Sequence, residues 1–258
     1  MVSFAEVIGA AQKGQGTLKL QVPSDWRQGR TAYGGFTAAV ACQAALQLGQ
    51  APPPLRSALI SFIGPVSGEI EARAEILRQG RSSLFVKTDV FSNEALAFSA
   101  NYVFMANRDS VVDFPAESAP IAPPPGEAVT WDRKDEPAFA RQFDFKHALE
   151  RSEIRAPRFR TWTRLKHREG VATPCELLLL ADALPPAALN LLRPPAPVSS
   201  VTWMLNILTA TPSSPDGWWL LDSSAQEARH GLSSQSMGLW SSAGEAVALG
   251  MQSAALFG

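Results

Sequence analysis

Two short sequence matches, separated by the same distance along the chain, constrain this fold more than any other feature. Gly80-Arg-Ser-Ser83 resembles Gly231-Leu-Ser-Ser234, and Glu94-Ala-Leu-Ala97 resembles Glu245-Ala-Val-Ala248. The spacing is identical, because 231 − 80 and 245 − 94 are both 151. Matching turns at one constant offset, with helix and strands in the same order in each half, predict a duplicated unit. The alternative is that two unrelated hairpins share their turn chemistry.

Each half is predicted to hold one buried helix and a run of antiparallel strands, which is an α+β arrangement. In the first half we expect strands at residues 17–22, 56–63, 68–78, 82–91 and 95–105, with an Ala-rich helix over 36–48. In the second half we expect strands at 158–166, 198–209, from 218, 231–241 and 245–257. Prolines punctuate the stretch between, so the predicted domains are 1–108, a Pro-rich linker at 109–138, and 139–258.

The helix of the second half is predicted from Thr173 to Leu184. Thr173 and Glu176 suit a capping box, and Pro185 prevents the helix from continuing. The helix is apolar nearly all round, so it is expected to be buried. Asp182 is the exception, and a buried carboxylate near a helix C-terminus should have a raised pKa, as a general base requires. The alternative is that Asp182 points to solvent.

Composition excludes several classes of function. The net charge is −1 and there is no basic block, so nothing indicates nucleic acid binding. We find no secretion signal and no apolar run long enough to span a membrane. Cys42 and Cys175 are expected to be buried core residues rather than a disulfide, and the predicted location is the cytoplasm.

A long helix enclosed by a curved antiparallel sheet is the hotdog fold, and two tandem modules give a double hotdog. The sequence resembles the acyl-CoA thioesterase II-like (TesB-like) double-hotdog family over most of its length. The resemblance rests on five motifs, which are Tyr33-Gly34-Gly35, Leu77-Arg-Gln-Gly-Arg-Ser82, Leu180-Ala-Asp182, Ser199-Ser-Val-Thr202 and Ala248-Leu-Gly-Met-Gln252.

This resemblance implies hydrolysis of an acyl-CoA to free acid and CoA, with Asp182, Ser200 and Gln252 around one water. Asp182 would be the base, and the other two would hold the water. Ser199 and Thr202 are alternative candidates for the role of Ser200. Strand alternation puts Thr202 on the same face as Ser200, so Thr202 could assist or replace it. Gly34 and Gly35 would let the substrate approach a helix N-terminus whose N–H groups polarise the carbonyl. No metal or cofactor is implied, and a homodimer is expected.

Comparison of the halves predicts one working site per chain. The 151 offset matches Gln252 with Asn101, and an offset of 140, from 174 − 34, matches Asp182 with Cys42 and Ser200 with Ile60. The first half would therefore supply only pocket wall. We find no Gly-x-Ser-x-Gly elbow, and the three histidines are far apart without ligand spacing. There are two alternatives. One is a non-catalytic binder of acyl thioesters or lipid-like ligands. The other is a hydratase, which the absence of the Asp-x-Asn-x-x-His motif of hotdog hydratases disfavours.

Overall fold

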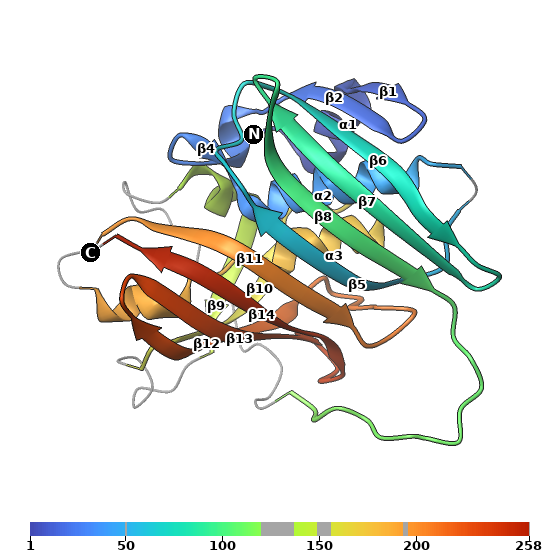
Figure 1. The fold of residues 1–258 in the computed structure, drawn as a ribbon. Coiled ribbons are helices and arrows are strands. Elements are labelled where there is room, and N and C mark those ends of the chain that lie inside the picture. Colours follow the sequence, from blue (N-terminus) through green and yellow to red (C-terminus); the bar gives the residue numbers. More distant parts are fainter. Residues whose placement is uncertain (50, 120–136, 149–155, 193–195, 258) are drawn as a thin grey trace.

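Figure 1 shows the computed structural model, which describes residues 1–49, 51–119, 137–148, 156–192 and 196–257. A 12-stranded sheet runs across the molecule. Two helices, α2 (Gly34–Leu46) and α3 (Thr173–Ala181), lie side by side against one face of this sheet. They have 13 and 9 residues.

The remaining elements follow in chain order. Those of the first half are α1 (Phe4–Ala10), β1 (Gln12–Gly14), β2 (Thr17–Gln21), the 3-10 helix η1 (Ser24–Trp26), β3 (Arg27–Gln28), β4 (Thr31–Ala32), β5 (Leu55–Phe62), β6 (Glu69–Gln79), β7 (Ser83–Ser92) and β8 (Ala95–Met105). Those of the second half are the 3-10 helix η2 (Ala138–Gln142), β9 (Phe143–His147), β10 (Arg158–Leu165), the 3-10 helix η3 (Ala187–Leu191), β11 (Val198–Ile207), β12 (Trp219–Arg229), β13 (Leu232–Ser241) and β14 (Ala246–Leu256).

The two halves join through their central strands. The sheet order is β1-β2-β6-β7-β8-β5-β11-β14-β13-β12-β10-β9. The β5–β11 pair is antiparallel, with Ile60 opposite Trp203, and connects two sets of strands that each come from one half of the chain. Sheet pairing across this junction makes the two modules one continuous layer.

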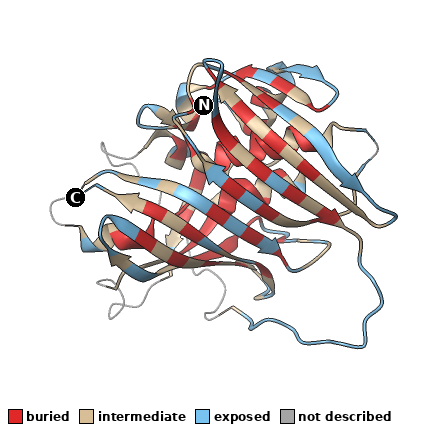
Figure 2. Cartoon of the chain, in the orientation of Figure 1, coloured by how far each residue is buried: buried red, intermediate tan, exposed pale blue. Residues whose placement is uncertain are grey.

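Burial alternates along the strands and covers most of both helices (Figure 2). In β13, every second residue from Ser233 to Ser241 is buried, as expected for a strand with one face against the core. Helix α2 is buried on nearly all sides, because small residues let it fit between the sheet and α3. The core therefore lies between the concave face of the sheet and the helix pair.

Matching irregularities in the strands show that the halves repeat the same structure. The β6–β7 pair and the β12–β13 pair each contain a register shift, after which pairing resumes at Arg78 and at Glu227. A second shift follows Val90 in the first half and Leu239 in the second. Both pairs give an offset of 149, since 227 − 78 and 239 − 90 are equal. The 151 offset predicted from the turns is therefore wrong for the strands. Its first match aligns Gly80 with Gly231, but at an offset of 149 these glycines stand at different positions in turns of equal length.

Helix α3 differs from its prediction at both ends. Its N-cap is Ala172, which makes no side-chain bond, so the expected capping box at Thr173 does not form. The helix ends at Ala181 rather than Leu184, and Asp182 is its C-cap. The physical reason is that Pro185 has no N–H to give the helix and disfavours helical backbone at the residue before it.

Most other predictions of secondary structure are confirmed to within two residues, with α2 running from Gly34 to Leu46 instead of 36–48. Helix α1 and strand β9 were not predicted. Cys42 and Cys175 are buried and free, as predicted. Most of the predicted linker, at 120–136, lies outside the described residues. Within the described part of the chain, none of the helices has the length and apolar character needed to cross a membrane.

Candidate active site

Asp182 lies where the C-terminal end of α3 meets the N-terminal end of α2. The backbone N–H of Gly35 donates a hydrogen bond to its carboxylate. A Cβ added to Gly34 would lie 2.6 Å from Asp182 Oδ2 and 2.9 Å from Cε1 of Phe62, so glycine is required for this close approach. The positive end of the α2 dipole therefore faces the carboxylate. The structure brings both predicted glycines to Asp182.

Gln252 reaches Asp182 from the facing sheet. Its Nε2 donates to Asp182 Oδ1 over 2.9 Å, and both side chains are buried. Gln252 lies on β14, opposite Trp203 of β11, so it projects from the concave face toward the helices. The solvent-facing orientation considered for Asp182 is therefore wrong, and Gln252 faces the core.

Gln235 extends this contact and was missed from the sequence. It pairs with Gln252 across β13 and β14, and its Nε2 donates to Gln252 Oε1 over 2.7 Å. Its own Oε1 accepts from the backbone N–H of Ala187 over 2.7 Å. Only the alternation of β13 could have indicated that a polar residue at this position faces inward.

The environment of Asp182 holds its pKa at about 7, because burial disfavours the charged form. The hydrogen bonds from Gln252 and from Gly35 oppose that rise. Tyr33 caps α2 nearby, and its hydroxyl donates to the carbonyl of Leu179 over 2.7 Å. Burial, together with the charge of Asp182, raises the pKa of Tyr33 well above its usual value. A carboxyl that titrates near neutrality is suited to accept a proton from water.

Ser200 and Thr202 do not share a face, so the prediction from strand alternation is wrong. A bulge at Val201 interrupts the pairing of β11 with β14, and Ser200 pairs with Ala254 whereas Thr202 pairs with Ser253. Ala254 is buried and is the next inward position after Gln252, so Ser200 lies on the concave side. Thr202 is exposed. The bulge thus favours Ser200 over Thr202 as the hydroxyl beside the site.

The corresponding positions of the first half carry different side chains. Helix α2 has Gln47 as its C-cap, with φ −93° and ψ 4°, close to the φ −98° and ψ 7° of Asp182. Phe98 on β8 and Ala248 on β14 are the last residues to pair before the equivalent register shifts. Tyr102 lies four residues after Phe98 and Gln252 four residues after Ala248, so these two positions correspond. The predicted matches with Cys42 and Asn101 are therefore wrong. Neither Gln47 nor Tyr102 supplies a carboxylate.

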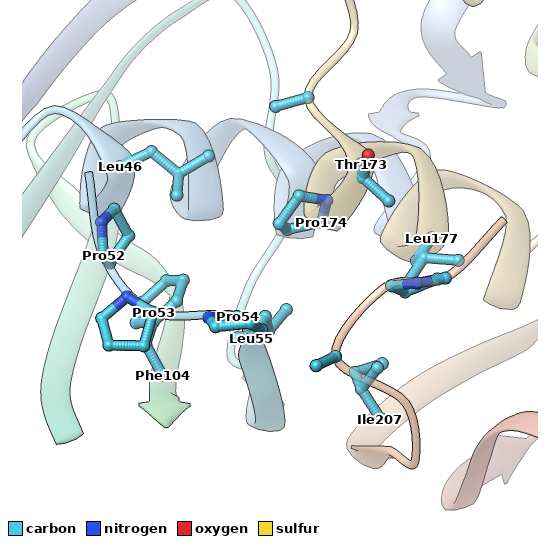
Figure 3. Close-up of a pocket in the computed structure, with 13 residues that line it drawn as sticks. Leu46, Pro52, Pro53, Pro54, Leu55, Phe104, Thr173, Pro174, Leu177 and Ile207 are labelled. Carbon is cyan, nitrogen blue, oxygen red and sulfur yellow. The ribbon is translucent and has the colours of Figure 1, made fainter. Parts of the chain in front are cut away.

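At the opposite ends of the two helices lies an apolar pocket of about 320 Å³ (Figure 3). The C-terminal end of α2 and the N-terminal end of α3 meet here, with Leu46 and Pro174 among the lining residues. A run of prolines, Pro52 to Pro54, forms one wall. None of the residues that line this pocket has a titratable side chain.

No group of three or more His, Cys, Asp or Glu residues suited to a metal occurs within the described ranges. The site is therefore built from a carboxylate, two carboxamides and backbone N–H groups. Such a set can accept a proton at Asp182 and hold a water or a carbonyl oxygen by donated hydrogen bonds.

Solved structures with the same fold are similar over nearly the whole chain. A hot dog fold protein of unknown function from Alicyclobacillus acidocaldarius is 19% identical, with a TM-score of 0.83 and coverage of 100% of this chain and 99% of that one. A putative thioesterase II from Thermobifida fusca is 20% identical, with a TM-score of 0.81 and coverage of 100% and 98%. An acyl-CoA thioesterase II, TesB2, from Mycobacterium marinum is 18% identical, with a TM-score of 0.76 and coverage of 98% and 96%. No curated protein sequence matches the chain.

These likenesses show a hotdog-fold protein. The family models that describe the N-terminal and C-terminal domains of acyl-CoA thioesterases match residues 22–105 and 115–256. The chain belongs to the acyl-CoA thioesterase family.

Proposed function

We propose that the protein hydrolyses an acyl-CoA to a free acid and CoA, with Asp182 as general base. The observation that carries this proposal is the buried carboxyl of Asp182, whose pKa is raised to about 7 and which Gln252 holds by a hydrogen bond. Membership of the thioesterase family supports the substrate class. The proposed unit is one site per chain, because Gln47 and Tyr102 stand at the equivalent positions of the first half.

In the proposed reaction, a water oxygen bonds to the thioester carbonyl carbon while Asp182 takes one of its protons. The carbon–sulfur bond of the tetrahedral intermediate then breaks, and the departing thiolate of CoA takes the proton from Asp182. Ser200 and the second N–H of the Gln252 amide hold the water. Gly34 and Gly35 remain our proposed substrate contacts at the start of α2. The structure puts Thr202 on the outer face of the sheet, away from Asp182, so we do not propose it as a contact.

The rate should depend on pH through Asp182. A base must be ionised to accept a proton, and the pKa of Asp182 is raised to about 7. We therefore expect kcat/KM to fall about tenfold for each pH unit below 7 and to level off above it. Thiol release from an acyl-CoA, measured between pH 5 and 9, checks this. A profile that is flat down to pH 5 would show that a group with an ordinary carboxyl pKa, or none, is the base.

The alternative function is a non-catalytic binder of acyl thioesters or lipid-like ligands. It is favoured by the apolar pocket in Figure 3, which lies away from the acid. Mixing the protein with short-, medium- and long-chain acyl-CoAs distinguishes the two functions. Release of free thiol supports the hydrolase, whereas binding by calorimetry without thiol release supports the binder.

We also propose that the protein is a homodimer, formed through the outer face of the central strands. Leu59, Met204 and Met251 are exposed neighbours across β5, β11 and β14, and they form an apolar row on this face. A twofold contact would bury the row against its copy. We expect light scattering to give twice the chain mass of 27.7 kDa, and Met204→Lys to give a monomer. Ile76→Lys, on exposed β6, should leave the dimer intact. A monomeric wild-type protein would contradict this.

A further inference from the structure

The hydrogen bonds beside Asp182 have a fixed direction, which begins at a backbone amide. Ala187 is the first residue of η3, and its N–H has no partner within that helix because it follows the N-cap Pro186. This N–H points at the Gln235 side chain, 2.7 Å away. A backbone N–H can only donate, so the atom of Gln235 that faces it must be the carbonyl oxygen.

Each later bond in the chain follows from the first. With its oxygen turned to Ala187, Gln235 has only its NH₂ group to offer Gln252, at 2.7 Å. Gln252 must then receive that bond on its own oxygen, which leaves its NH₂ group for Asp182, at 2.9 Å. All three side chains are buried, so these bonds within the protein are the ones that fix the orientation of the two amides.

We propose that Gln235 is a positioning residue, which fixes the Gln252 amide so that it presents N–H, never its carbonyl, to Asp182. The direction matters for chemistry. An N–H donor stabilises the ionised carboxylate that accepts a proton from water, whereas a carbonyl would stabilise the protonated acid. With its oxygen held by Gln235, Gln252 acts only as a hydrogen-bond donor at the site.

Among the groups around Asp182, the amides of Gln235 and Gln252 are the ones whose orientation can change the pKa of the carboxyl group. From α2, the Gly35 N–H donates to the carboxylate, and Tyr33 is the titratable neighbour that interacts with it. From β5, Phe62 contributes an apolar ring. From β14, Gln252 supplies the other bond. Of these, only the Gln252 amide changes from donor to acceptor by rotating, and Gln235 prevents that rotation.

Two substitutions separate the positioning role from a structural one. Gln235→Met removes both bonds with little change of volume. Gln235→Glu keeps an oxygen to accept from Ala187, but its ionised form cannot donate to Gln252, so the Gln252 amide should reverse. If Gln235 only satisfied Ala187, the titration midpoint of Asp182 in the uncharged Gln235→Met variant would stay at its wild-type value. Gln142→Met is the control, because Gln142 is equally buried and bonds the carbonyl of Val2 instead.

The main readout is titration of Asp182 by ¹³C NMR, with its carboxyl signal assigned from Asp182→Asn. We expect the titration midpoint to move to higher pH in both Gln235 variants and to stay in place in Gln142→Met. Thiol release should show kcat at pH 6.5 lowered about tenfold or more, with KM little changed. A wild-type midpoint in a folded Gln235→Glu protein would overturn the proposal.

The effect of Gln235 on catalysis rests on the proposed function, but the NMR titration that tests its positioning role does not. If the wild-type protein released no thiol from any acyl-CoA, the hydrolase proposal would fail, while the NMR titration would still decide the direction of the amides. If Gln235→Met does not fold, Gln235→Glu retains the bond to Ala187 and carries the same measurement.

Discussion

Replacing Asp182 by Asn should lower kcat about 100- to 10,000-fold, because a general base typically contributes that much to the rate. The side chain keeps its size, so the protein should fold. Thiol release under saturating acyl-CoA measures the loss. Asp89→Asn is a suitable control, since Asp89 is a carboxylate on β7 that bonds Ser99 and Lys87 instead. An Asp182→Asn protein with wild-type turnover would exclude Asp182 as the base.

The same variant should change how stability depends on pH. The folded-state pKa of Asp182 is raised from 3.8 to about 7, so the folded protein binds more protons than the unfolded chain between those values. Wild-type stability is therefore lost as pH rises from about 4 to about 7, and this contribution is absent in Asp182→Asn. Thermal unfolding should show the variant gaining on the wild type by up to about 4 kcal/mol across that window. A difference in stability that stays constant with pH would mean that folding does not raise the pKa of Asp182.

The second large effect is expected from Gly34→Ala. The added methyl group would lie 2.6 Å from Asp182 Oδ2 and 2.9 Å from the Phe62 ring, so the carboxylate or the ring must move. We expect stability to fall by about 1–3 kcal/mol and turnover to fall at least tenfold, since misplacing a catalytic group is costly. Denaturant unfolding and thiol release measure the two effects.

Gly9→Ala is the matched control for this substitution. Gly9 lies in a helix, α1, and an added Cβ there would meet nothing within 4 Å. Its replacement should leave activity unchanged and stability equal or slightly higher, because alanine restricts the unfolded chain. If Gly34→Ala behaved like Gly9→Ala, the close contact between α2 and Asp182 would not exist in the protein.

Much of the fold follows from local sequence patterns. Alternation and turn residues predicted β8 at Ala95–Met105 and the other long strands within two residues, since each of them has one face against the core. Strand β9 was missed because it is short and its position at the sheet edge depends on pairing with β10. The β5–β11 junction is likewise a tertiary contact, which no local pattern specifies.

The site was only partly predictable for related reasons. Asp182 stands out because a carboxylate interrupts an apolar helix, and Gln252 was found through the family resemblance. Gln235 carries no such signal, because its importance comes from facing Gln252 on the next strand. The bulge at Val201 has no marker in the sequence, so alternation misplaced Thr202. The division at 1–108, 109–138 and 139–258, the role of Ser200 and the cytoplasmic location stay predictions.

The most direct test of the central claim is one turnover in H₂¹⁸O, with enzyme in excess over acyl-CoA and the product acid analysed by mass spectrometry. If Asp182 activates a water that attacks the thioester, the first molecule of acid formed carries one ¹⁸O atom. If Asp182 instead attacked the thioester itself, water would attack the resulting anhydride at either carbonyl. A first product without ¹⁸O, together with ¹⁸O in the Asp182 carboxyl group, would contradict the account.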